Sequence, residues 1–216
     1  FMSVLQRITC SDEEKITLLH DHNLLSNIGD YNDVIRAMRR ANCQAGFINA
    51  VFDEAVKNNM ANPETYKQII FARSRMIKAD IQELIQFIRS AIANGFVSAD
   101  IYDLTLENMG RFEQVDNALA LALVEEVERK KIVSPSTYDH IIKIIGLSPL
   151  PQILEYLGKA KSLNCVTPVT YQMILEILAR HTELQGLTPD QRVELASRLY
   201  VEAKQTSPDS ARIYEL

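Results

Sequence analysis

Apolar residues recur along this chain at the spacing of an amphipathic α-helix. The clearest stripe surrounds a set of tyrosines, because the positions three, four and seven residues after each tyrosine are mostly apolar. Neighbouring positions are both apolar, which is typical of a helix face and not of a strand. Only Arg73 interrupts the stripe, and Thr105 softens it. The pattern predicts one helix at each of Tyr31, Tyr66, Tyr102, Tyr138 and Tyr171.

A short recurring phrase precedes four of these tyrosines and marks a helix start. Four residues before the tyrosine stand side chains that commonly cap helix N-termini; they are Asn62, Ser98, Ser134 and Thr167. Three of them are followed directly by proline, which suits the first helical position because its missing N–H has no partner to lose. An apolar residue also stands six positions before each of the four tyrosines. Each copy therefore predicts the start of a new helix.

The tyrosines are 35, 36, 36 and 33 residues apart, so the helices belong to a repeat. A second apolar segment follows each first helix and predicts second helices over 46–57, 80–94, 113–129 and 148–162. Ser11 and Glu14 have the spacing of a capping box and predict a helix to about Ser26. Thr188 begins another helix that continues to about Lys204.

One helical hairpin cannot bury its apolar faces alone, so stacked hairpins are expected. We predict an all-α solenoid of about ten helices in a single domain over residues 1–216. Its parts are an N-terminal capping helix at 11–30, four to five repeats over 31–182, and capping helices over 183–216.

A hairpin of this length whose first helix begins with Thr-Tyr resembles the pentatricopeptide repeat. The best copies are Thr65-Tyr66, Thr137-Tyr138 and Thr170-Tyr171, and the resemblance covers about residues 27–180. It implies a right-handed solenoid. The alternative is the tetratricopeptide repeat, with a period of about 34 residues, but no recurrent Trp-Leu-Gly set is present.

Most members of the family bind single-stranded RNA and read one base with two residues of each repeat. The resemblance places one of them directly after the tyrosine and the other four residues before the next tyrosine. Polar side chains there can hydrogen-bond a base edge. The implied groove residues are Asn32, Asn62, Lys67, Ser98, Asp103, Ser134, Asp139 and Thr167. Only Asn32 with Asn62 has the residue types usual in the family.

Nine residues after the tyrosines, four of five positions hold arginine. These residues are Arg40, Arg75, Arg111 and Arg180. A row of guanidinium groups can track a phosphate backbone. Cations at these positions are also typical of helix C-termini, where they interact with the helix dipole and extend into solvent. We expect the second arrangement, because Asp103 and Asp139 would place negative charge in the same groove.

Composition narrows the choice of function. The net charge is −5 and the pI is about 5.5, whereas electrostatic nucleic-acid binders are usually basic. No apolar run reaches the length of about 20 residues that a membrane span needs, and no signal-peptide pattern is present. Cys10, Cys43 and Cys165 lie far apart without zinc-ligand spacing. No catalytic motif is recognisable, so we predict neither an enzyme nor a bound metal or cofactor.

The leading hypothesis is a non-enzymatic interaction scaffold that binds a protein or peptide in the cytoplasm. The first alternative is a single-stranded RNA binder that uses the arginine row. The second alternative is an accessory repeat domain of a longer protein. Because the pentatricopeptide family is mostly organellar, the resemblance adds the mitochondrion as an alternative compartment.

Overall fold

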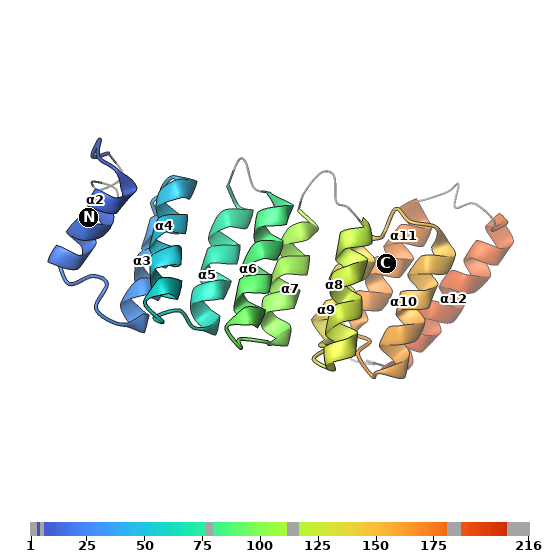
Figure 1. Cartoon of the computed structure of the whole chain (residues 1–216). Helices are drawn as coiled ribbons and strands as arrows, with labels where there is room; N and C mark the ends of the chain where they lie inside the picture. Colours follow the sequence, from blue (N-terminus) through green and yellow to red (C-terminus); the bar gives the residue numbers. More distant parts are fainter. Residues whose placement is uncertain (1–3, 5–6, 77–79, 112–116, 181–186, 207–216) are drawn as a thin grey trace. The chain divides into compact units, whose positions relative to one another are not determined.

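The computed structural model describes residues 4, 7–76, 80–111, 117–180 and 187–206. Within these ranges all regular structure is helical, so the all-α prediction is confirmed there (Figure 1). The described ranges contain eleven such helices, against about ten expected for the chain. They are α2 (Asp12–Asp21), α3 (Ile28–Arg40), α4 (Ala45–Lys57), α5 (Pro63–Ser74), α6 (Ile81–Ala93), α7 (Ala99–Met109), α8 (Asn117–Lys130), α9 (Pro135–Ile144), α10 (Leu150–Ser162), α11 (Pro168–Arg180) and α12 (Pro189–Thr206). None of these helices is both long and apolar enough to cross a lipid bilayer.

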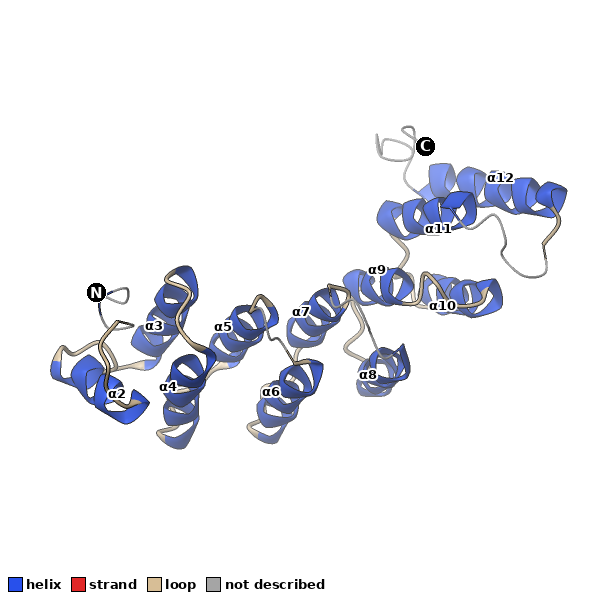
Figure 2. Cartoon of the chain, turned by 90° about the horizontal axis from the view of Figure 1, so that it is seen from above, coloured by secondary structure: helices blue, strands red, loops and turns tan. Residues whose placement is uncertain are grey.

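The chain divides into two compact units, residues 1–108 and 109–216. In the first unit, α3 contacts α4 and α5, α5 contacts α6, and α2 contacts α4. Figure 2 shows α3, α5 and α7 in one layer of this unit and α4 and α6 in another. In the second unit, α9 contacts α8, α10 and α11, and α11 contacts α12. Successive first helices therefore contact each other in both units, α3 with α5 and α9 with α11. The single domain over residues 1–216 and its proposed boundaries stay a prediction.

The repeated tyrosines occupy equivalent places, as the sequence predicts. Each is the fourth residue of its helix, and none is more than 3% exposed; they are Tyr31, Tyr66, Tyr102, Tyr138 and Tyr171. The Tyr66 ring meets Phe52 edge-on, with ring centroids 5.2 Å apart. Its hydroxyl accepts a hydrogen bond from Asn94 Nδ2 at 3.0 Å. The tyrosine column thus buries its rings, and at Tyr66 the hydroxyl still reaches a polar partner.

Reciprocal hydrogen bonds begin four of the five first helices. The cap side chain accepts from the N–H three residues on, and the side chain at that later position accepts from the N–H of the cap. The pairs are Asn27–Asp30, Asn62–Thr65, Ser134–Thr137 and Thr167–Thr170. The predicted cap is wrong at Ser98, whose buried hydroxyl has no hydrogen-bond partner in the described part of the chain. Ile101 stands where the other copies have a hydroxyl or carboxylate, so it cannot complete the reciprocal pair.

The Ser134 cap carries a stability prediction. Its Oγ accepts from the Thr137 N–H at 3.3 Å, and alanine cannot replace that acceptor. We expect Ser134→Ala to lower the free energy of unfolding by about 1 kcal/mol, and Ser134→Gly by only a few tenths. Urea denaturation of the three proteins measures both changes. Equal losses for the two variants would show that the hydroxyl contributes nothing as a cap.

The second helices end on residues with positive φ, seven positions before the next tyrosine. They are Asn59 (56°), Gly95 (79°), Lys131 (56°) and Asn164 (53°). The N–H of the following residue donates back into the helix; for example, the Phe96 N–H donates to the Ala91 carbonyl at 2.8 Å. That following residue is the apolar one noted six positions before each tyrosine. The apolar column is therefore part of a Schellman motif, in which a hydrophobic contact accompanies the reversal of the chain.

The N-terminal boundary differs from the prediction. Helix α2 ends at Asp21 and does not continue to about Ser26, because Asn23 adopts φ 54° and the Leu24 N–H donates to the Leu19 carbonyl at 2.9 Å. Helix α3 begins at Ile28, so residues 28–30 belong to the first tyrosine helix and not to a capping helix. Parts of the predicted helices and segments lie outside the described residues, namely 113–116, 181–186 and 207–216.

Candidate interaction surface

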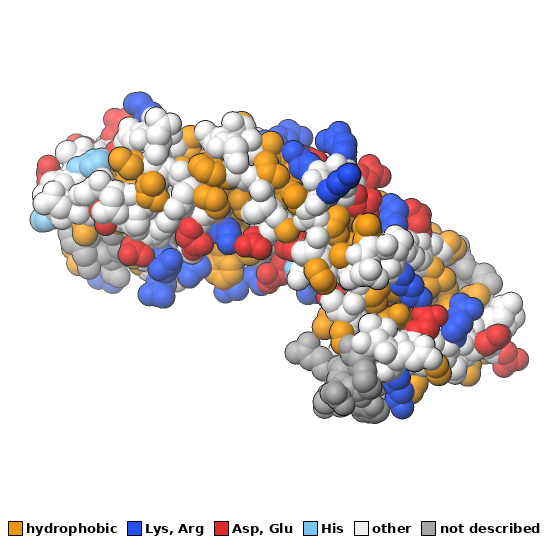
Figure 3. Space-filling view, turned by 90° about the horizontal axis from the view of Figure 1, so that it is seen from below, with side chains coloured by type: hydrophobic (Ala, Val, Ile, Leu, Met, Phe, Trp, Pro, Cys, Tyr) orange, Lys and Arg blue, Asp and Glu red, His pale blue; other side chains and the backbone are white. Residues whose placement is uncertain are grey.

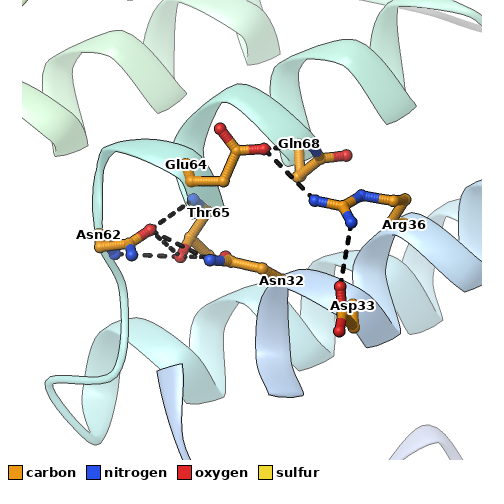
Figure 4. Close-up of polar contacts among 7 residues, drawn as sticks. All are labelled: Asn32, Asp33, Arg36, Asn62, Glu64, Thr65 and Gln68. Atoms are coloured by element: carbon orange, nitrogen blue, oxygen red, sulfur yellow. Dashed lines mark hydrogen bonds and ion pairs between the residues drawn. The ribbon is translucent and has the colours of Figure 1, made fainter. Parts of the chain in front are cut away.

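The residue directly after a tyrosine reaches the next first helix. Asn32 on α3 is only 7% exposed, and its Nδ2 donates to Asn62 Oδ1, the cap of α5, at 3.3 Å (Figure 4). Its Oδ1 accepts from the hydroxyl of the fully buried Thr65 at 2.6 Å. Asn32 and Asn62, the one pair with the residue types usual for base reading, are thus hydrogen-bonded to each other, and Asn32 is also bonded to the buried Thr65.

Two further positions in this column make the same connection with other chemistry. Asp139 on α9 accepts from the Thr167 hydroxyl at 2.9 Å and from the Thr170 hydroxyl at 2.5 Å, both at the start of α11. Lys67 Nζ on α5 lies 2.9 Å from Asp100 Oδ2, in the first turn of α7. Three of the implied base-reading positions therefore connect successive first helices.

Three groove candidates remain, namely Ser98, Asp103 and Ser134. Asp103 is half-buried on α7 in the first unit, and Ser134 caps α9 in the second unit. Ser98 precedes α7 and makes no cap, as described above.

Charged side chains of both signs cover the outer side of the first helices in the first unit. Arg36 Nη1 lies 3.1 Å from Asp33 Oδ1, and Arg36 Nη2 lies 3.6 Å from Glu64 Oε1 (Figure 4). Gln68 Nε2 donates to the same Glu64 oxygen at 2.6 Å. The face shown in Figure 3 likewise has basic side chains interspersed with acidic ones. This surface is not a stripe of a single charge.

The arginines of the column occupy three kinds of environment. Arg180 Nη2 lies 3.0 Å from Glu176 Oε2, as expected for a helix-end charge that pairs with a neighbour. Arg111 is exposed just after α7. Arg40 and Arg75 line one shared pocket in the first unit. The fifth position of the column is Leu147, which is 85% exposed.

The shared pocket has a volume of about 800 Å³ and lies at the C-terminal ends of α3 and α5. We call it the arginine pocket; its charged and aromatic lining consists of Arg39, Arg40, Phe71 and Arg75. The Arg39 and Arg75 Cζ atoms lie over the Phe71 ring, 4.4 and 4.0 Å from its centroid. Burial lowers the pKa of Arg39, and the nearby charges of Arg40, Arg75 and Arg36 lower that pKa further. Positive charge is therefore concentrated here.

The second unit has a smaller pocket at the same place in the repeat, with a volume of about 280 Å³. It lies along α9 and α11, and its lining consists of Lys143, Gly146, Leu147, Met173, Glu176, Ile177 and Arg180. Leu147 corresponds to Arg40 when the hairpins are aligned on their tyrosines, and Glu176 corresponds to Phe71. The equivalent place thus changes from three arginines around an aromatic ring to a mixture of apolar, basic and acidic side chains.

Sequence reasoning missed Arg39 and Phe71. Arg39 adjoins Arg40 at a helix end, and Phe71 precedes Arg75 by one helical turn, a spacing at which side chains meet. The sequence signal that would have predicted this contact is an aromatic residue one helical turn before an arginine of the column.

Two cysteine thiols and one aspartate carboxyl are affected by burial. Burial raises the pKa of the Cys43 and Cys165 thiols and of the Asp53 carboxyl. Among the residues that the structure describes, no group of three or more His, Cys, Asp or Glu side chains is placed to hold a metal ion. In comparisons with known proteins, no family model matches the chain, and no curated protein matches it.

Proposed function

We propose that this chain is a non-enzymatic scaffold whose helical hairpins stack into a right-handed solenoid of the pentatricopeptide kind. It binds a protein or peptide on the side formed by its first helices. The observation that supports this best is the use of Asn32, Lys67 and Asp139 to connect successive first helices. To read a base, Asn32 would have to give up its hydrogen bonds with the buried Thr65 hydroxyl and with Asn62, at a cost of about 1–3 kcal/mol for the two.

A peptide does not need those side chains. It can bind through pockets and exposed polar groups, and both units have a pocket at the C-terminal ends of their first helices. Mixed surface charge suits a peptide that carries both polar and apolar groups. A phosphate backbone instead requires repeated positive charge, and the arginine column is interrupted at Leu147 and neutralised at Arg180.

The RNA alternative has one observation in its favour, the convergence of Arg40 and Arg75 on one pocket. The discriminating experiment compares two ligands on the whole chain. A random peptide library displayed on phage is selected on the immobilised protein, and a fluorescent mixed-sequence RNA is titrated at low and moderate salt. We expect saturable peptide binding and no saturable RNA binding. Tight RNA binding with a steep negative salt slope, and no selected peptide, would reject the scaffold function.

Replacing Asn32 tests the observation itself. Asn32→Ala removes the closer acceptor of the Thr65 hydroxyl, which keeps Asn62 Oδ1 at 3.0 Å, and it removes the donor to Asn62. We expect a loss of about 1–3 kcal/mol in the free energy of unfolding, measured by urea denaturation, and no change in the RNA titration. A base-reading residue would behave in the opposite way, with RNA affinity lost and stability kept.

A further inference from the structure

The arginine pocket holds three cations that pair with no carboxylate among the described residues. Arg39, Arg40 and Arg75 form no ion pair with an acidic side chain in the part of the chain that the structure describes. Other basic residues of the same unit do so, such as Arg36 with Glu64 and Lys67 with Asp100. In a chain with a net charge of −5, three arginines left unpaired at one pocket indicate an anion-binding site.

The Phe71 ring fixes two of these cations in place. Both the Arg39 and the Arg75 guanidinium lie within cation–π distance of its centroid. Two like charges held beside one ring repel each other, and an anion bound between them would relieve that repulsion. Because the ring already orders the two side chains, binding an anion also loses less side-chain entropy.

Helix ends at the pocket do not reverse its charge. Gln44 and Ala45 line the pocket and begin α4, which has no side-chain cap, so its N-terminus contributes a positive partial charge. Helices α3 and α5 end at Arg40 and Ser74, and each of these ends contributes a negative partial charge. Each partial charge is about half an elementary charge, so the three helix ends leave a small negative remainder and the three guanidinium charges decide the sign.

The size and lining of the pocket favour a peptide over a lone phosphate. Ala45, Ala72 and Met76 add apolar surface beside the arginines, and about 800 Å³ is room for several side chains. The smaller pocket of the second unit has a mixed lining, in which the cations Lys143 and Arg180 stand with Glu176 and Arg180 is paired with that carboxylate. A polynucleotide would need the positive charge to continue there, whereas an acidic side chain needs it only once.

We propose that the arginine pocket binds a peptide segment in which a carboxylate stands beside an apolar side chain. This inference rests on the proposed scaffold function and names the class of partner. The carboxylate is held by Arg40 and Arg75, and the apolar side chain packs against Phe71 and Met76.

The test uses peptides selected from the random library on the whole chain. Each is synthesised with a fluorescein label, together with a version in which Asp and Glu are replaced by Asn and Gln. Both versions are titrated by fluorescence anisotropy against wild type, Arg40→Gln, Arg75→Gln and Arg89→Gln. Arg89 is exposed on α6 and does not line the pocket, so it controls for the loss of one positive charge. Arg40 is exposed and makes no contact with Phe71 like those of Arg39 and Arg75, so its replacement should leave the fold intact.

We expect the selected peptides to contain acidic residues next to apolar ones. Their affinity should fall about tenfold or more in Arg40→Gln and Arg75→Gln, and in the neutral peptide versions, and stay unchanged in Arg89→Gln. Peptides that lack acidic residues and bind Arg40→Gln as well as wild type would overturn this inference and leave the scaffold function standing. Failure to select any peptide, with RNA binding that Arg40→Gln weakens, would overturn both.

Discussion

Glu83→Ala is expected to lower the free energy of unfolding by about 3–5 kcal/mol. Glu83 on α6 accepts from Arg73 Nε on α5 at 3.0 Å and from Asn49 Nδ2 on α4 at 2.7 Å. Arg73 is only 7% exposed. Without Glu83 its guanidinium stays buried with no carboxylate, which is far more costly than losing a surface ion pair. Urea denaturation of the two proteins measures the difference.

Two matched variants separate the buried charge from simple side-chain loss. In Arg73→Met/Glu83→Ala the unpaired cation is absent, and methionine continues the apolar stripe of α5, so we expect a smaller loss than in Glu83→Ala alone. Glu64→Ala removes a carboxylate from the more exposed Arg36 pair and should cost less than about 1 kcal/mol. A loss of that small size in Glu83→Ala would refute the argument.

Tyr138→Ala is expected to cost about 3–5 kcal/mol of unfolding free energy. The ring is fully buried, and its hydroxyl donates to Glu128 Oε1 at 2.8 Å. Alanine leaves a cavity where the ring packs, whereas Tyr138→Phe keeps the ring and loses only the hydrogen bond. Thermal and urea denaturation should therefore rank wild type above the phenylalanine variant and both well above the alanine variant. Equal stability of the alanine variant and wild type would contradict a core role.

The same tyrosine predicts the response to alkaline pH. Burial raises the pKa of Tyr138 above its ordinary value, and the hydrogen bond to Glu128 raises that pKa further. The folded state therefore favours the neutral phenol. Its contribution to stability is complete below the unfolded pKa of about 10 and is lost as pH rises from there through the folded pKa. Wild type should lose stability above about pH 10 more steeply than Tyr138→Phe. Tyr31 and Tyr156 are present in both proteins and burial raises their pKa values too, so Tyr138→Phe should still lose some stability in this pH range.

Local patterns predict most of the fold because they report local physics. The tyrosine column fixes the buried face of each first helix, and Ser134 with Pro135 marks a helix start within a residue of where α9 begins. The same reasoning fails at Ser98, whose hydroxyl makes no cap, and Ile101 three positions on has no side-chain oxygen for the reciprocal bond. It fails at the end of α2, because positive φ at Asn23 is not visible as an interruption of the apolar pattern.

The features that sequence patterns do not predict depend on contacts between residues far apart in the chain. Arg73 interrupts the stripe in the sequence, and its reason appears only when α6 brings Glu83 beside it. Asn62 is fully explained as a local cap, so nothing in its neighbourhood predicts that Asn32 bonds to it from 30 residues away. The sequence pattern aligns Arg40 with Arg75, but only the fold shows that the Phe71 ring lies under both Arg39 and Arg75, in a pocket that Arg40 also lines.

The connections between first helices differ from one hairpin to the next in a way that fixes their order. Asn32 offers an amide to an amide and a hydroxyl, Lys67 offers a cation to a carboxylate, and Asp139 accepts from two hydroxyls. A hairpin transplanted to another position would meet a partner of the wrong polarity; lysine in place of Asp139 would face two threonine hydroxyls without a carboxylate. The hairpins share the same backbone arrangement, but each has side chains complementary to those of its neighbour, so they are not interchangeable modules.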